Sequence, residues 1–83
     1  MFVGAKFRRT EKGDSLIGYQ EIEIVERVLS STTEHKTKRD GVSVVVVAHD
    51  YVLHCRCDDT IATIIEDELE SELIHGLYEY VKP

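Results

Sequence analysis

The amino-acid sequence predicts an α+β domain: a small antiparallel β-meander of three to four strands packed by one C-terminal acidic helix. Three observations support this fold class. Residues that favour strands dominate the chain up to Cys57, an Asp-Gly pair separates two strand-like runs, and apolar residues recur four apart after residue 60. With 83 residues, the chain has room for a single domain, residues 1–83. The meander is compatible with an open sheet and with a barrel-like closure.

The first strand is predicted over residues 2–9, where Gly4 marks a bulge or a close backbone approach. A polar loop follows at residues 10–15. The pattern of residues 19–29 fits both a strand and a helix face. Its β-branched residues favour a strand, which polar strand-forming residues extend to about Lys38.

An Asp-Gly pair at residues 40–41 predicts a tight hairpin turn, because both residue types tolerate the positive φ angles that such a turn needs. A further strand is predicted from Val42 to Ala48, and the extended character of the chain continues through Cys57. Its four consecutive valines, Val44–Val47, indicate a strand that is covered on both faces. A straight strand over all of residues 42–57 would exceed ~50 Å, so we expect the chain to bend or to reverse near residues 49–50.

A helix is predicted over residues 59–75. Asp58, Asp59 and Thr60 offer an N-cap, and Gly76 suits a left-handed C-terminal cap. The apolar ridge of this helix, which we expect to pack against the sheet, consists of Ile61, Ile65, Leu69 and Leu73. Residues 77–81 alternate in polarity and predict a short terminal strand.

The net charge of −6 arises from 16 acidic and 10 basic residues, and it is unevenly distributed. Residues 58–83 hold eight acids and one base, whereas residues 1–57 hold eight acids and nine bases. A concentrated negative charge repels phosphate and suits a basic protein surface. The residues expected to bind such a partner are Glu66, Asp67, Glu70 and Glu72. The alternative is a solvated helix face that keeps the protein soluble.

No catalytic or nucleotide-binding motif is present in the sequence. The favoured hypothesis is a small non-enzymatic protein-interaction module, an inhibitor or adaptor whose acidic helix engages a basic surface of a nucleic-acid-handling protein. Phage-encoded anti-restriction and anti-CRISPR proteins that mimic DNA act in this way. This analogy depends on size and charge alone.

The alternative hypothesis is a β-barrel-like domain that binds RNA or a nucleotide through a basic N-terminal strand and hairpin turn. Basic side chains attract phosphate, and nearby Phe7 and Tyr19 offer rings on which bases stack. The residues expected to bind are Lys6, Arg8, Arg9, Lys36, Lys38 and Arg39.

Residues 3–7, Val-Gly-Ala-Lys-Phe, followed by a β-rich meander, resemble the start of SH3-like or Tudor-like small barrels. The resemblance covers under a third of the chain. It implies a small barrel, and no functional residue is carried over from it.

Metal-ligating residue types crowd into residues 49–59, namely His49, His54, Cys55, Cys57, Asp58 and Asp59. Structural zinc sites use paired Cys-x-x-Cys spacings, whereas this chain has one Cys-x-Cys. In a strand, Cys55 and Cys57 share a face with other apolar residues, which indicates core thiols. Acidic neighbours disfavour an activated cysteine nucleophile. We therefore expect neither a metal nor a cofactor.

The apolar residues exceed what one interface between a sheet and a helix can bury, which predicts a homodimer. The residues expected at its interface are Val44, Val46, Ile74 and Tyr78. A closed monomeric barrel is the alternative. No apolar run reaches the ~20 residues of a membrane helix, and two cysteines are too few for a disulfide scaffold. These features predict a soluble cytoplasmic protein.

Overall fold

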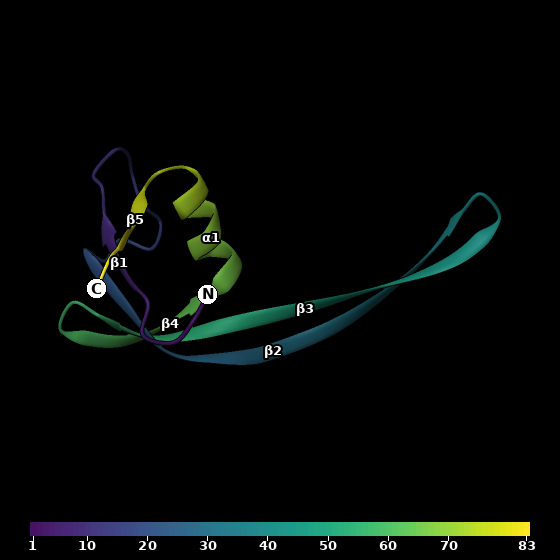
Figure 1. The fold of residues 1–83 in the computed structure, drawn as a ribbon, viewed down its shortest axis with the longest axis horizontal. Coiled ribbons are helices and arrows are strands. Elements are labelled where there is room, and N and C mark those ends of the chain that lie inside the picture. Colours follow the sequence, from purple (N-terminus) through teal and green to yellow (C-terminus); the bar gives the residue numbers. More distant parts are fainter.

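A computed structural model describes residues 1–83 and shows one five-stranded antiparallel sheet with a single short helix (Figure 1). The α+β class is confirmed, with five strands instead of three to four. The strand order is β4-β3-β2-β1-β5, so the sheet is open and not a closed barrel. The elements in chain order are β1 (Lys6–Arg9), β2 (Glu21–Arg39), β3 (Val42–Cys57), β4 (Thr60–Ile65), α1 (Glu66–Ile74) and β5 (Tyr78–Val81).

The hairpin of β2 and β3 is the longest feature of the fold, and its turn is the predicted one. Asp40 and Gly41 have φ angles of 50° and 78°, as a two-residue hairpin turn requires. Only the open end of this hairpin, the beginning of β2 and the end of β3, lies within the broader sheet. β1 pairs with β2 at Glu21–Glu23, and β4 pairs with β3 at Val52–Cys57.

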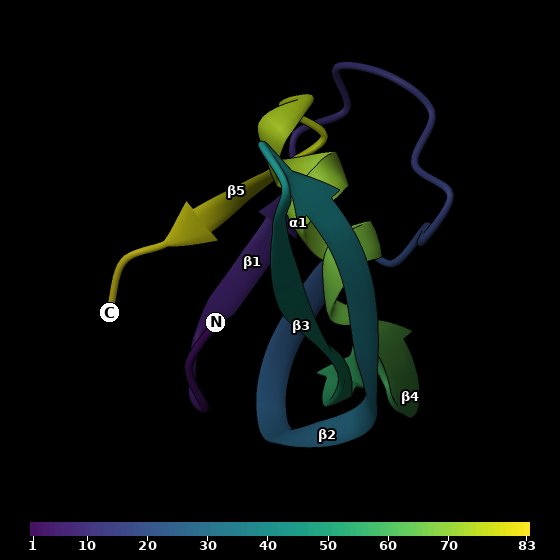
Figure 2. The same ribbon diagram turned by 90° about the vertical axis from the view of Figure 1, so that its right-hand side faces the viewer.

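Beyond these pairings, residues 28–51 project as a two-stranded ribbon, hereafter the arm (Figure 1). The rest of the molecule is hereafter the body, and the end of the arm that joins it is the root. The molecule is 52 Å long and only 25 Å by 23 Å across. The two strands twist about each other along the arm, as Figure 2 shows from the direction of its tip. The expectation that the valine strand is covered on both faces is therefore wrong: its side chains lie in the arm, beyond the helix and the flanking strands.

Of the bend or reversal expected near residues 49–50, the reversal does not occur, because β3 continues through this point without a turn. The register between β2 and β3 shifts instead on β2, between Leu29 and Ser31, opposite Tyr51 and Asp50. Such a bulge bends a ribbon without reversing it. A reversal is not needed because most of this strand lies in a projecting ribbon and does not have to fit within the rest of the sheet.

The helix begins later than the sequence pattern predicts. Residues 60–65 form β4, and the N-cap is Ile65. Five of these six residues are β-branched, which favours a strand over a helix. Ile61 is consequently 78% exposed instead of forming part of a helix ridge. Leu69 is fully buried as predicted, and Leu73 is half-buried.

Asp58 and Asp59 form a two-residue turn between β3 and β4 instead of the predicted helix cap. Asp58 has a positive φ of 50°. Its carboxylate accepts hydrogen bonds from the backbone N–H groups of Gln20 and Glu21, at 3.2 and 2.9 Å. This aspartate thus connects the turn to the start of β2.

The N-terminal segment approaches β2 before the first regular strand begins at Lys6. Gly4, with a φ of 90°, donates its N–H to the carbonyl of Ile24 at 2.7 Å. The predicted close approach at Gly4 is confirmed, and the strand is shorter than residues 2–9. The predicted terminal strand is also confirmed, as β5 at Tyr78–Val81. Gly76 adopts the predicted left-handed conformation, with a φ of 74°.

The core lies between α1 and one face of the body strands, and α1 stands between β5 and the root of the arm (Figure 1). The opposite face of the sheet has no helix against it. No helix of this structure combines the length and the apolar character required to cross a membrane. The buried apolar residues are Ala5, Phe7, Ile22, Ile24, Leu53, Cys55, Cys57, Ile64, Leu69 and Tyr78.

Candidate functional site

The acidic residues expected to form one exposed helix face fall into two groups. Asp67 and Glu70 are exposed, whereas Glu66 and Glu72 are buried. Glu72 accepts hydrogen bonds from the hydroxyl of Ser15 and from the N–H of Ile17, at 3.2 Å for the latter. The expectation that all four side chains face outward is therefore wrong for Glu66 and Glu72, which bind other parts of the same chain.

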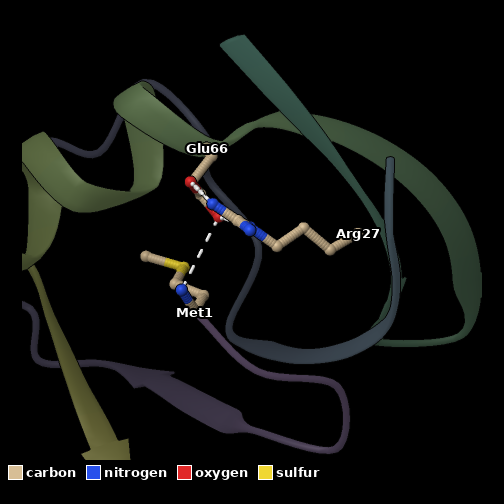
Figure 3. A network of polar contacts seen from close by, with 3 residues as sticks. All are labelled: Met1, Arg27 and Glu66. Carbon is tan, nitrogen blue, oxygen red and sulfur yellow. Dashed lines mark hydrogen bonds and ion pairs between the residues drawn. The ribbon is translucent and has the colours of Figure 1, made fainter. Parts of the chain in front are cut away.

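Glu66 lies at the point where α1 meets the root of the arm (Figure 3). Its carboxylate accepts two hydrogen bonds from Arg27, at 2.6 and 2.8 Å, and lies 3.6 Å from the N-terminal ammonium group of Met1. Hydrogen bonding from Arg27 holds the pKa of Glu66 below its usual range, against the opposing effect of burial. The guanidinium carbon of Arg27 also lies 3.5 Å from the ring centroid of Tyr51. This network connects both arm strands to the helix.

The predicted basic residues do not form one surface. Lys6 and Arg8 lie on the helix-free face of the sheet, where they pair with Glu23 at 3.5 Å and with Glu79 at 3.1 Å. Arg9 donates to the carbonyl of Gly13 at 3.3 Å. Phe7, one of the rings expected to stack on bases, is buried in the core. The other predicted basic residues lie at the tip of the arm: Lys36, Lys38 and Arg39.

The helix-free face carries a hollow of about 330 Å³, which Lys6, Arg8, Glu21, Glu23, Arg56 and Asp58 help to line. Its charges largely offset one another, since Glu23 also pairs with Arg56 at 3.2 Å. A surface of internally paired charges gives no strong preference for an anionic or a cationic ligand.

The cysteine-rich segment forms part of the core. Cys55 and Cys57 are fully buried with free thiols, and burial raises the pKa of Cys55 to about 12. His54 lies on the opposite face of β3, where its ring is 4.0 Å from the carboxylate of Glu26. No group of three or more histidine, cysteine or acidic side chains is placed to hold a metal ion.

The four residues predicted for a dimer interface lie in three separate places. Val44 and Val46 lie in the arm, and Ile74, which is 82% exposed, ends α1. Tyr78 is buried and donates its hydroxyl to the carbonyl of Tyr19. The prediction that these four residues form a single patch is therefore wrong. Only the two valines belong to a continuous apolar surface.

That continuous surface is the β3 side of the arm. Val45, Val46 and Val47 are 54%, 50% and 47% exposed. Because side chains alternate along a strand, these valines face both sides of the ribbon. Their partners on β2 are polar: Lys36, His35 and Glu34 lie opposite them. Over residues 42–48 of β3 and the β2 residues opposite them, the arm thus pairs an apolar strand with a polar one.

The backbone of β3 is also free along the edge that faces away from β2. The two-residue turn makes Arg39 and Val42 a hydrogen-bonded pair. Hydrogen-bonded and outward-facing positions then alternate. The N–H and C=O groups that point away from β2 are therefore those of Ser43, Val45, Val47 and His49.

Within the body, the β3 residues that form hydrogen-bonded pairs with β4 alternate in the same way. Cys57 and Thr60 flank the other two-residue turn, so Cys57, Cys55 and Leu53 form the hydrogen-bonded pairs with β4. This pairing ends where Ile65 meets Val52. From Tyr51 to Val42, the edge of β3 is therefore a direct continuation of a paired edge, with no strand beside it.

No protein-family model, no curated protein and no solved structure matches this chain.

The free edge of β2 in the arm differs from that of β3 in its chemistry. The β2 residues that point their backbone groups outward include Lys36 and Lys38, and lysines on an edge strand oppose pairing with another chain. On β3, residues 42–48 contain no charged residue. The valine run predicted this strand, but no signal in the sequence shows that β4 stops beside Val52 and leaves the edge open.

Proposed function

We propose that this protein is a non-enzymatic protein-interaction module that docks through its arm, by adding a strand of its partner to the free edge of β3. The observation that carries this proposal is an apolar strand whose side chains and backbone edge are both exposed. Exposed apolar patches mark interaction surfaces. In strand addition, main-chain hydrogen bonds supply affinity and the side chains on both faces supply specificity.

The position of the arm supports this role. Residues 28–51 project from the body, so a partner can reach both faces and the edge of β3 without disturbing the core (Figure 1). Arg27 stacks on Tyr51 and binds Glu66 at the root of the arm. A ribbon whose root is fixed to the helix is partly preorganised, which lowers the entropic cost of binding.

The acidic helix gives weaker support for docking to a basic surface than the sequence indicated. Glu66 and Glu72 bind Arg27 and the Ser15 loop, which leaves Asp67, Glu68 and Glu70 exposed. An exposed acidic helix face also serves solubility alone. The arm is favoured because solubility does not explain an exposed valine strand.

Nucleic-acid binding through the tip of the arm has weaker support than protein binding. Residues 28–51 carry three bases, Lys36, Lys38 and Arg39, and three acids, Glu34, Asp40 and Asp50. At the tip itself, Lys36, Lys38 and Arg39 beside Asp40 leave only two net positive charges, and so few phosphate contacts give little of the affinity of a nucleic-acid-binding protein.

A photo-crosslinking amino acid placed at residue 45 tests the proposal in cells of the source organism. Val45 and Lys36 lie directly opposite each other, and each points its backbone groups to a different free edge. We expect a discrete protein adduct from residue 45, strongly reduced when Val47→Pro is added, because proline removes an outward N–H. The matched control, the same crosslinker at residue 36, should give at least tenfold less adduct. Adducts of equal yield from both positions, no adduct, or a nucleic-acid adduct would contradict the proposal.

A further inference from the structure

We infer that the strand added to β3 is the β3 strand of a second copy of this chain, antiparallel to the first about a two-fold axis at Val45. This inference rests on the proposed function and names its partner. The paired arms would form a four-stranded ribbon in the order β2-β3-β3-β2, with one body at each end.

The uncharged part of β3 is self-complementary in this register. With the axis at Val45, this residue pairs with its own copy, Val44 pairs with Val46, and Val42 pairs with Ala48. The whole segment 42–48 is therefore matched with itself, and none of its side chains is charged. Cross-strand pairs of β-branched residues are favourable, whereas like charges placed opposite each other oppose pairing.

The length of the free edge supports the same axis. The edge is open from Val42 to Tyr51, because β4 pairs with β3 up to Val52. With the axis at Val45, Val42 of the second copy lies beside Ala48. The hairpin turn of the second copy then lies beside residues 49–51 of the first, where no other strand is present. An axis at Val47 would instead place Val42 of the second copy beside Val52, a position that Ile65 already occupies.

The arrangement of polar and apolar strands also favours a second copy. In the single chain, the apolar strand of the arm lies at an edge. In the paired ribbon, the two β3 strands become central and the two β2 strands become the edges. Lysine-bearing strands at edges and uncharged β-branched strands at the centre follow the usual pattern of natural sheets.

Charge supports the antiparallel direction. Residues 28–51 carry three acids and three bases, so the net charge of −6 resides in the rest of the chain. Neutral arms do not repel each other. Antiparallel pairing places the two negatively charged bodies at opposite ends of the ribbon, where their repulsion is screened over a Debye length of ~10 Å at 0.1 M salt.

The first test is the mass of the purified protein in solution, measured by light scattering from micromolar to millimolar concentration. The wild-type protein should reach twice the mass of one chain. Val45→Pro removes one outward N–H from β3 without removing a hydrogen bond between β2 and β3, and this variant should remain a monomer. Lys36→Pro makes the same change at the same level of the arm on the β2 edge, and it should dimerise like the wild type. Far-ultraviolet circular dichroism of both variants checks that the hairpin stays folded.

The second test locates the axis with single cysteines at positions 44, 45, 46 and 47. Cys55 and Cys57 are fully buried, so they do not compete in the folded protein. Under mild oxidation, Val45→Cys should give at least five times more disulfide dimer than Val44→Cys or Val47→Cys. Lys36→Cys, on the other edge, should give no more dimer than the wild type.

The outcomes separate this inference from the proposed function. A monomer at all concentrations overturns the second copy as partner, while the photo-crosslink from residue 45 to a different protein would still support docking through the arm. A dimer that Val45→Pro leaves intact, or that Lys36→Pro abolishes equally, overturns pairing through the β3 edge. Equal disulfide yields at all four β3 positions would contradict a fixed register.

Discussion

Arg27 donates two hydrogen bonds to the carboxylate of Glu66, from Nε at 2.6 Å and from Nη2 at 2.8 Å (Figure 3). Arg27 belongs to β2 at the root of the arm, and Glu66 is the first residue of α1. The bidentate geometry fixes the orientation of the guanidinium group as well as its position. This pair therefore fixes the helix to the strand from which the arm projects.

The Arg27–Glu66 pair predicts a specific pH dependence of stability. The pKa of Glu66 is lowered in the folded state, so its ionised form stabilises the fold above the unfolded pKa of about 4.3. This contribution is lost as the pH falls through the lowered pKa of the folded state. The free energy of unfolding of Glu66→Gln, measured by urea titration, should therefore lie below that of the wild type at pH 7. The gap between the two should narrow below pH ~4.

Glu70→Gln is the control for this experiment, because Glu70 is exposed on the same helix. Its stability should follow that of the wild type throughout. A Glu66→Gln variant as stable as the wild type at pH 7 would show that the pair does not stabilise the fold.

Leu69 is the helix residue on which packing against the sheet most depends, because its side chain is fully buried. Leu69→Ala should lower the free energy of unfolding by about 2–5 kcal/mol, through lost burial and the cavity left behind. Ile74, at the end of the same helix, is 82% exposed. Ile74→Ala should therefore change the free energy of unfolding by about 0.5 kcal/mol or less. Chemical denaturation of both variants makes the comparison. Equal losses would mean that the helix does not dock through Leu69.

The two thiols of the chain should be unreactive while the protein is folded. Burial raises the pKa of Cys55 to about 12 and also raises that of Cys57, so both remain protonated at pH 8. A thiol-specific chromogenic disulfide reagent should therefore label neither residue in the native protein and both residues in urea. Rapid labelling of the native protein would show that the face of β3 towards the helix is open.

Glu72 should hold the loop between β1 and β2 against the helix. It accepts hydrogen bonds from Ser15 and from Ile17, and Lys12 lies exposed in the same loop. Glu72→Ala should therefore increase the rate of tryptic cleavage after Lys12 several-fold, because the loop opens more often. Mass spectrometry of timed digests measures this rate, with Glu70→Ala as the control. An unchanged rate would mean that other contacts hold the loop.

Local patterns in the sequence predict much of the hairpin and of the terminal strand. The turn at residues 40–41, the extended character of residues 42–57 and a strand within residues 77–81 all match the structure. These features depend on residues close together in the sequence. Asp and Gly set the turn, β-branched residues favour extended backbone, and alternation marks the face of a strand.

The errors arise where distant parts of the chain meet or where two periodicities compete. Apolar residues four apart indicated a helix over residues 60–65, but the β-branched residues there form β4. In the sequence, Glu66 and Glu72 look like members of an exposed acidic surface. They are buried because they bind Arg27 and Ser15, which lie 39 and 57 positions away. The open edge of β3 is likewise a tertiary property, since it depends on where β4 ends.

Amide hydrogen exchange of the arm, resolved by residue and repeated at increasing protein concentration, tests the central claim most directly. The N–H groups of Val45 and Val47 point to the free edge of β3, and those of Lys36 and Glu34 point to the free edge of β2. If β3 strands pair between copies, exchange at Val45 and Val47 should slow at least tenfold as the dimer forms. Exchange at Lys36 and Glu34 should remain fast. Rates that do not depend on concentration at Val45 and Val47, or protection of the β2 edge instead, would contradict the account.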